Sequence, residues 1–129
     1  MIDKNKFNWR KYLKECLEAT VYCSLGTVDR KGVWSNPVYF AYDDSYNLYF
    51  ISMPHSRHMK NIKMDGRIAV SIYSTNQDTH GDVVGIQLEG EAYVLPDKEV
   101  PDAHKLYFKR VYPNGHDKNP KDNMGKKAV

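Results

Sequence analysis

Cysteine and long apolar stretches are both scarce in this chain of 129 residues. Its two cysteines, Cys16 and Cys23, are too few for a disulfide framework, and this scarcity favours a reduced, cytoplasmic setting. No stretch reaches the ~18 apolar residues of a membrane span. The N-terminal segment also lacks the apolar core of a secretory signal. We therefore expect neither a membrane protein nor a secreted one.

An excess of charge and the common nucleotide-binding and hydrolase motifs are also missing. The 19 basic and 16 acidic residues leave a net charge of +3, which is too small to indicate nucleic acid as a partner. There is no P-loop, no G-x-G-x-x-G and no G-x-S-x-G, so no motif names a catalytic residue. His55 and His58 are spaced as H-x-x-H but lack a nearby acidic or sulfur ligand, so we expect no metal site.

The periodicity of the apolar residues is what the chain does offer. Apolar residues recur with a helical period from Trp9 to Leu17, behind the candidate N-cap Asn8, and again up to Val111. A shorter helix is expected from Ser56 to about Met64. Alternating segments predict five strands, at Ala19–Val28, Val33–Tyr42, Leu48–Met53, Arg67–Tyr73 and Val83–Leu95.

Strands joined by short polar turns favour a mainly β, α+β fold, namely a closed or partly closed antiparallel barrel with short flanking helices. We expect residues 1–112 to form one domain. Residues 113–129 lack an apolar period, which predicts either a flexible tail or a truncated strand. Because a domain of this size buries only a modest core, oligomerisation is also expected.

The start of the short helix is the main candidate site. Backbone N–H groups at a helix N-terminus lack internal partners, and the helix dipole favours an anion there. Ser56 can cap the helix or donate to a phosphate, Arg57 offers a fork for two phosphate oxygens, and His58 and Lys60 add further donors. The alternative is an ordinary Ser cap followed by a solvated basic helix.

Two strand segments lie close to this helix in the sequence. Pro37 cannot donate a ladder hydrogen bond, so it predicts an edge or a bulge, where backbone can approach a ligand. Ile51 and Ser52 end the strand that directly precedes the helix, so their backbone could meet a planar ring. The alternative is that Ser52 is simply a polar residue at a strand edge.

Other polar residues are interpreted as structural. Cys23 lies in a strand and is expected in the core. The carboxylate pair Asp43 and Asp44 falls in a predicted turn and is interpreted as solvated. Glu89 and Glu91 share a strand face, which is either a polar sheet surface or a contact with another subunit.

Taken together, these segments resemble a known family. The runs NPVYFAYDD, NLYFISMPHSRHMKNI, GRIAVSI and GIQLEGEAYVL are similar to those of the pyridoxamine 5′-phosphate oxidase-like, FMN-binding split-barrel proteins, over roughly Ala19 to Leu95. The resemblance implies a six-stranded split barrel and a homodimer with FMN at its interface. It also implies contacts to the flavin from eleven positions, namely Asn36, Pro37, Val38, Ile51, Ser52, Ser56, Arg57, His58, Lys60, Gly85 and Gln87.

The resemblance assigns these positions different roles. The segment of Ser56, Arg57, His58 and Lys60 would hold the phosphate, and Ile51 and Ser52 would meet the isoalloxazine ring. The strand of Asn36, Pro37 and Val38 would lie beside the flavin. The segment around Gly85, Ile86 and Gln87 would approach from the second subunit.

The resemblance is incomplete at its C-terminal side. Pyridoxamine-phosphate oxidases carry a segment with Trp and Arg that this chain does not match, so vitamin B6 oxidation is not expected. The favoured hypothesis is an FMN-dependent oxidoreductase that uses NAD(P)H or an unknown small molecule. The alternatives are a non-catalytic flavin or haem module and a reductase that uses the deazaflavin F420. A nucleic-acid-binding barrel ranks last.

Overall fold

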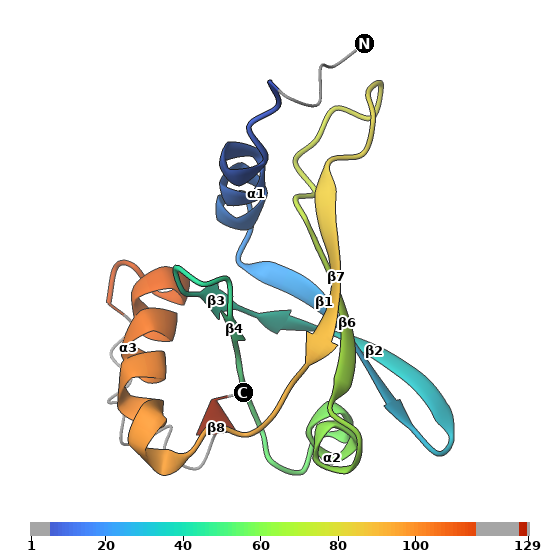
Figure 1. Cartoon of the computed structure of the whole chain (residues 1–129), viewed down its shortest axis with the longest axis vertical. Coiled ribbons are helices and arrows are strands. Elements are labelled where there is room, and N and C mark those ends of the chain that lie inside the picture. The colour runs from blue at the N-terminus through green and yellow to red at the C-terminus, as the bar shows by residue number, and fades with distance from the viewer. Residues whose placement is uncertain (1–5, 116–126, 129) are drawn as a thin grey trace.

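The structure, a computed structural model, describes residues 6–115 and 127–128. Its α-helices in this part of the chain lie close to the predicted segments (Figure 1). The Asn8 side chain accepts a hydrogen bond from Lys11 N (3.1 Å), which confirms the predicted N-cap. The helices are α1 (Trp9–Glu18), α2 (Arg57–Met64) and α3 (Val100–Val111), the last preceded by the 3-10 turn η1 (Asp97–Glu99).

Every strand pair in the described residues is antiparallel. The strands form one four-stranded sheet in the order β2-β1-β6-β7 and two small sheets, β3-β4 and β5-β8. The predicted antiparallel α+β fold is confirmed, whereas a closed six-stranded barrel stays a prediction. The strands are β1 (Tyr22–Asp29), β2 (Gly32–Tyr39), β3 (Ala41–Tyr42), β4 (Leu48–Tyr49), β5 (Ile51–Ser52), β6 (Arg67–Tyr73), β7 (Gly85–Glu91) and β8 (Lys127–Ala128).

Two predicted strands are interrupted, each at a buried phenylalanine. The strand expected at 33–42 breaks at Phe40, and the strand expected at 48–53 breaks at Phe50. Both side chains are buried, so the backbone bends where each ring enters the core. The Phe40 N–H still bonds to Val21 O (3.0 Å), and the next residue already pairs with β4. The bend therefore moves the chain from one sheet to another.

The last predicted strand is shorter than expected because, at its start, the side chain of Gln77 bonds the backbone in place of a neighbouring strand. The amide of Gln77 donates to Val84 O (2.8 Å) and accepts from Val84 N (2.9 Å), so the ladder starts only at Gly85. At the other end, Ala92 N donates to Gly66 O (2.8 Å), and the pairing stops there. The predicted tail lies largely outside the described residues, but β8 within it pairs with β5.

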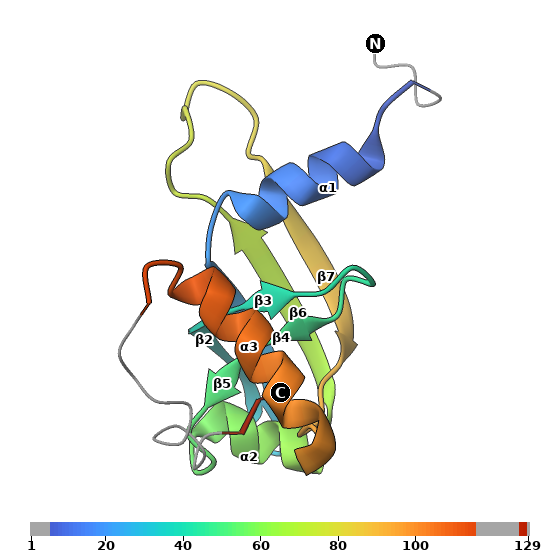
Figure 2. The ribbon, with the colours of Figure 1, turned by 90° about the vertical axis from the view of Figure 1, so that its left-hand side faces the viewer.

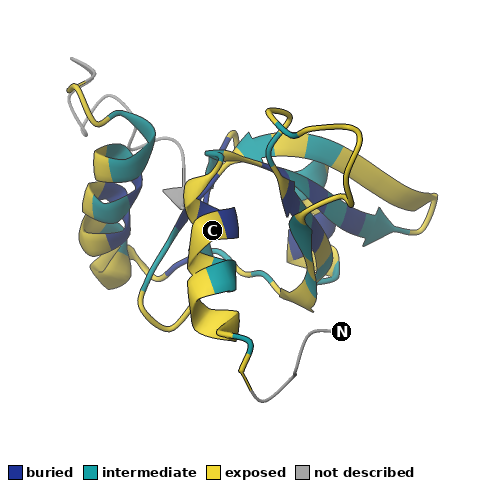
Figure 3. Cartoon of the chain, turned by 90° about the horizontal axis from the view of Figure 1, so that it is seen from above, coloured by how far each residue is buried: buried dark blue, intermediate teal, exposed yellow. Residues whose placement is uncertain are grey.

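The core lies between the four-stranded sheet and the segments that follow the bend of the chain at Phe40. Cys23, Leu25 and Thr27 of β1 are buried, and the residues between them face the other side of the sheet. Cys23 is thus a core residue, as predicted, and burial raises the pKa of its thiol to about 12. Buried residues gather between the sheet and the helices in Figure 3. The main cluster contains Leu17, Cys23, Leu25, Phe40, Phe50, Met59, Ile62, Val70 and Ile72.

The side chain of Arg110 attaches α3 to this framework. Figure 2 shows α3 crossing in front of β3 and β4. Arg110 Nε donates to Phe40 O (3.1 Å), and its Nη2 donates to Leu17 O and to Thr20 O (2.7 Å). Its Nη1 lies 3.5 Å from Glu18 Oε2, and the side chain is only 13% exposed. One guanidinium therefore binds the end of α1, the bend at Phe40 and α3 together.

Removing this guanidinium should weaken the whole fold. We expect Arg110→Ala to lower the free energy of unfolding by ~2–4 kcal/mol, because several carbonyl oxygens lose a charged donor in a largely buried place. Arg110→Lys keeps the charge without the fork and should lose less. Chemical denaturation measures both changes. The control is Lys109→Ala, an exposed neighbour expected to stay within about 0.5 kcal/mol, and an equal loss in that variant would contradict the assignment.

Candidate functional site

Three of the predicted phosphate-binding and ring-binding residues meet where β5 passes into α2. His58 Nε2 lies 2.7 Å from Ser52 Oγ and 3.4 Å from Ser56 Oγ, and Ser56 Oγ donates to Met53 O (2.8 Å). Pro54 follows the strand and ends it, so the chain turns there and Ser56 becomes the N-cap of α2. We call this group of Ser52, Ser56 and His58 the corner cluster.

The N-terminus of α2 has no side-chain cap from Ser56. Ser56 has extended backbone angles, and its side chain forms no capping hydrogen bond to the helix. The hydroxyl instead bonds back to Met53, so the first N–H groups of the helix have no side-chain cap from Ser56. Burial lowers the pKa of His58, so its imidazole is neutral near pH 7 and can donate or accept. This arrangement suits a phosphate or carboxylate.

Arg57 is held on the other side of the helix start by residues that the sequence reasoning missed. Its Nε lies 3.5 Å from Asp29 Oδ2, and its guanidinium carbon lies 4.4 Å from the centre of the Trp34 ring. Asn61 is buried and contacts Thr27 Oγ1 (3.0 Å). When the side-chain amide of Asn61 is flipped, its nitrogen donates to Asp29 Oδ2 (3.1 Å) and its oxygen accepts from Thr27 Oγ1.

Asp29 and Trp34 belong to the tight β1–β2 hairpin, whose Gly32 has a φ of +132°, a conformation that glycine adopts most readily. No local pattern marks these residues as neighbours of α2, because the pairing depends on how the hairpin folds over the helix. Lys60 is exposed one turn along α2. Arg57 thus joins the hairpin to the start of α2. Its side chain remains 39% exposed.

The segment Asn36–Val38 divides between the two faces of the sheet. Asn36 and Val38 face the same side as Leu25 and Cys23, whereas Pro37 pairs with Ser24 on the other side. Pro37 lies in β2, an edge strand of the four-stranded sheet, as predicted. The Asn36 Oδ1 atom is buried without a hydrogen-bond partner in the described structure. Strand β2 as a whole contacts both α2 and β5, the two elements that carry the corner cluster.

Gly85 and Gln87 do not approach the corner cluster within one chain. They lie on β7, the edge strand opposite β2. The register places Pro37, Ser24, Ser71 and Gln87 in one row across the sheet, so three strand spacings, ~14 Å, separate Pro37 from Gln87. This face carries a groove of about 540 Å³, called here the outer groove, which is lined by Ser24, Gly26, Ser35, Ala69, Val70, Ser71, Gln87, Leu88 and Glu89.

Two other features were sought in the part of the chain that the structure describes. No group of three or more His, Cys, Asp or Glu side chains there is placed to hold a metal ion. None of the helices described is both long enough and apolar enough to cross a bilayer.

Comparison with families of known proteins gives one match that spans nearly the whole chain. Residues 10–128 match the family described as pyridoxamine 5′-phosphate oxidase. No curated protein sequence gives a significant match.

Solved structures share the fold at low sequence identity. A protein of unknown function from Agrobacterium tumefaciens str. C58 has a TM-score of 0.75 at 20% identity, over 99% of this chain but 53% of that one. An F420 reductase has a TM-score of 0.66 at 22% identity, over 90% of this chain and 88% of that one. A FAD and haem binding protein from Mycobacterium smegmatis has a TM-score of 0.71 at 14% identity, over 92% and 63%. At such identities the likeness concerns the fold alone.

The lowered pKa of His58 predicts a loss of stability in mild acid. The unfolded state holds a histidine with an ordinary pKa of about 6.5, so it binds more protons than the folded state as the pH falls through that value. Stability should therefore be present above pH ~6.5 and decrease below it. Burial lowers the pKa of His104 in the same direction.

Urea denaturation at pH 7.5 and pH 5.5 measures this effect in the wild type and in His58→Gln. The variant should lose less stability between the two pH values than the wild type does. His55→Gln is the matched control, because His55 is exposed and lies just before the same helix. An identical pH dependence in all three proteins would contradict the role of His58.

Proposed function

Since the chain belongs to the pyridoxamine 5′-phosphate oxidase family, we propose that it binds FMN and acts as a flavin-dependent oxidoreductase. The observation that carries this proposal is the corner cluster at the start of α2. Two hydroxyls and a neutral imidazole converge there, beside N–H groups that the Ser56 side chain leaves uncapped. The uncapped N–H groups and the Ser52–His58 pair can donate to a phosphate ester, and the Ser56 hydroxyl can do so when it turns away from Met53 O. The nearby Arg57 and Lys60 supply positive charge.

The residues of the site have separate tasks in this proposal. Ser56, His58 and the N–H groups of α2 hold the phosphate, with Arg57 and Lys60 adding charge. Ile51 and Ser52 orient the ring from the end of β5. FMN, when bound, supplies the electron transfer between a donor such as NAD(P)H and a small-molecule substrate. No described side chain is assigned as a catalytic acid or base.

The position of β7 supports a homodimer as part of this proposal. Gly85 and Gln87 lie at the sheet edge far from the corner cluster, so in this proposal they reach the flavin from a second chain. The face that carries the outer groove supports such an association. Its tyrosines Tyr22, Tyr39 and Tyr73 are 37% to 54% exposed, which is unusual for large aromatic residues of a small domain. We also propose that the strands of this chain form a six-stranded split barrel.

Two alternative cofactors have support from the structural neighbours. One neighbour is described as binding FAD and haem, and another as an F420 reductase. A haem module would not need the anion-binding end of α2, whereas F420 carries a longer anionic tail and would want more basic residues than Arg57 and Lys60. The corner cluster, which is compact, favours the single phosphate of FMN.

The absorption spectrum of the purified protein tests the cofactor directly. We expect flavin bands in the near ultraviolet and the blue, and a higher melting temperature with saturating FMN, because a ligand of the native state stabilises it. A colourless protein whose melting temperature does not respond to FMN would overturn the proposal. A Soret band would indicate haem instead. If FMN binds but neither NADH nor NADPH reduces it, the result would indicate a flavin-binding module without oxidoreductase activity.

Substitution of Arg57 tests the phosphate end of the site. Arg57→Ala should weaken FMN binding about 10- to 100-fold, which corresponds to the ~1.5–3 kcal/mol of a charge-assisted hydrogen bond. Fluorescence titration of FMN measures the affinity. Lys63→Ala removes an exposed charge from the last turn of the same helix and should leave affinity unchanged. Asp29→Asn frees Arg57 from its carboxylate partner and should not weaken binding. Equal losses in Arg57→Ala and Asp29→Asn would mean that Arg57 only positions α2.

A further inference from the structure

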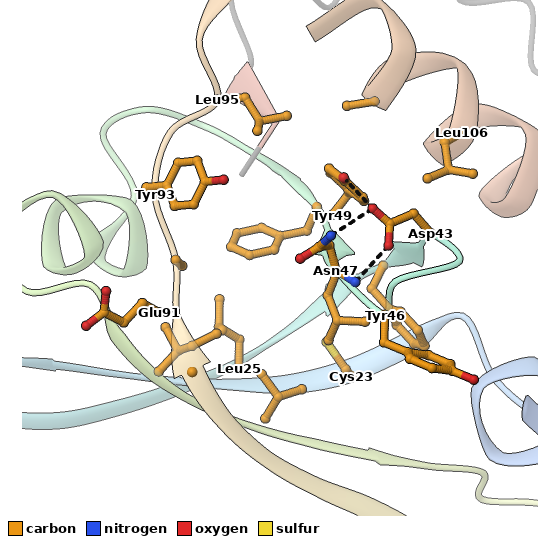
Figure 4. Close-up of a pocket in the computed structure, with 18 of the residues that line it drawn as sticks. Cys23, Leu25, Asp43, Tyr46, Asn47, Tyr49, Glu91, Tyr93, Leu95 and Leu106 are labelled. Carbon is orange, nitrogen blue, oxygen red and sulfur yellow. Dashed lines mark hydrogen bonds between the residues drawn. The ribbon is translucent and has the colours of Figure 1, made fainter. Parts of the chain in front are cut away.

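A cavity of about 940 Å³ opens on the opposite face of the sheet from the outer groove (Figure 4). It lies between β1, β6 and β7 on one side and the β3–β4 hairpin and the η1–α3 segment on the other. We call it the inner cavity. None of the eleven residues expected to contact the flavin lines it. Its floor is apolar and is formed by Leu25, Phe40, Phe50, Val70 and Leu88.

The rim of the inner cavity is acidic and aromatic. Among the described residues that line it, five carry carboxylates and one, Lys98, carries an amine. Tyr49 and Tyr93 stand on opposite sides, and Figure 4 shows the Tyr93 hydroxyl directed into the space between them. Carboxylates combined with aromatic rings and an apolar floor are the groups that bind organic cations.

Asp43 is the best-positioned of these carboxylates. It accepts hydrogen bonds from Ser45 N (2.9 Å), Asn47 N (2.9 Å), Asn47 Nδ2 (3.0 Å) and Tyr49 Oη (2.8 Å). Partial burial opposes ionisation, but these bonds outweigh it and lower the pKa of Asp43. Asp43 therefore has a structural role in its turn and faces the cavity, so the interpretation of it as a merely solvated residue was incomplete.

Tyr49 links this carboxylate to the rest of the rim. Burial, the hydrogen bond to Asp43 and the nearby charges of Asp43 and Glu99 raise the pKa of Tyr49 to about 12. Its hydroxyl thus stays neutral and keeps donating to Asp43. Asp43, from the β3–β4 turn, and Glu99, from η1, both line the inner cavity with Tyr49. Negative charge converges there from two elements that are distant in the sequence.

We propose that the inner cavity binds a small organic cation with a flat apolar body, with its ammonium group near Asp43, Tyr49 and Glu99. The apolar body would lie over the floor formed by Leu25, Phe40 and Leu88. A phosphate-bearing flavin is disfavoured here because the lining carries an excess of carboxylates.

The inner cavity and the proposed flavin site have no residue in common, although Phe50, which lines the cavity, has its ring 6.3 Å from that of His58. Along β1, Cys23 and Leu25 line the inner cavity, whereas Ser24 and Gly26 line the outer groove. On β6 and β7 the division is incomplete, since Val70, Leu88 and Glu89 line both spaces. Because the two proposed sites share no residue, the cation site stands or falls independently of the FMN site.

Three indoles of matched size test the charge preference. Tryptamine is a cation near neutral pH, tryptophol is neutral, and indole-3-propionate is an anion. In isothermal titration of the wild-type chain, tryptamine should bind at least ~10-fold more tightly than either of the others. Amide shifts in NMR spectra should fall on residues of the rim, such as Tyr49 and Tyr93. Equal affinities for the three indoles, shifts confined to the outer groove, or no saturation by ~10 mM tryptamine would overturn the proposal.

Matched variants of the rim complete the test. Asp43→Asn keeps a side-chain acceptor for the turn but removes the charge. Glu99→Gln changes an exposed carboxylate that forms no hydrogen bond within the described residues. Each should weaken tryptamine binding by ~5-fold or more and reduce the preference over tryptophol. Asp82→Asn makes the same change on an exposed loop and should have no effect. FMN affinity should stay unchanged in all three variants. A variant that loses FMN affinity but keeps its tryptamine affinity would place the residue at the flavin site and contradict its assignment to the inner cavity.

Discussion

The guanidinium of Arg110 is the interaction on which the arrangement of this protein depends. It bonds the carbonyl of Phe40 at the point where the chain leaves the four-stranded sheet, and the carbonyls of Leu17 and Thr20 around the end of α1. Backbone carbonyls at a bend and at a helix end lack regular partners, so a single charged donor satisfies several of them at once. The bend directs β3 and β4 away from the sheet, and α3 is held across them.

Two potential binding regions of opposite character follow from this arrangement. Strands β4 and β5 lead the chain to the start of α2, where hydroxyls, an imidazole and uncapped N–H groups suit an anion. The space left between the sheet and the β3–β4 hairpin is instead lined by Asp43, Glu99 and tyrosines. Phe50 lies between the two regions, since it lines the cavity and its ring is 6.3 Å from that of His58.

The residues of the corner cluster illustrate how far local reasoning reaches. Ser56 and His58 are two residues apart at a helix start, and Ser52 ends the preceding strand, so their meeting was predictable from order along the chain. The partners of Arg57 were not, because Asp29 and Trp34 reach it only through the folding of a distant hairpin. The same reason hid the breaks at Phe40 and Phe50, since alternation of side chains continues through a bend that only core packing imposes.

The sequence alone determined the helices, most strand positions and the family to which the chain is similar, because each of these depends on residues close together in the chain. Only the tertiary structure decided which face Asn36 and Pro37 occupy, which guanidinium holds the bend, and that Asp43 and Glu99 act on one cavity. These features join residues far apart in sequence, where pairing register and packing, rather than local periodicity, determine which side chains meet.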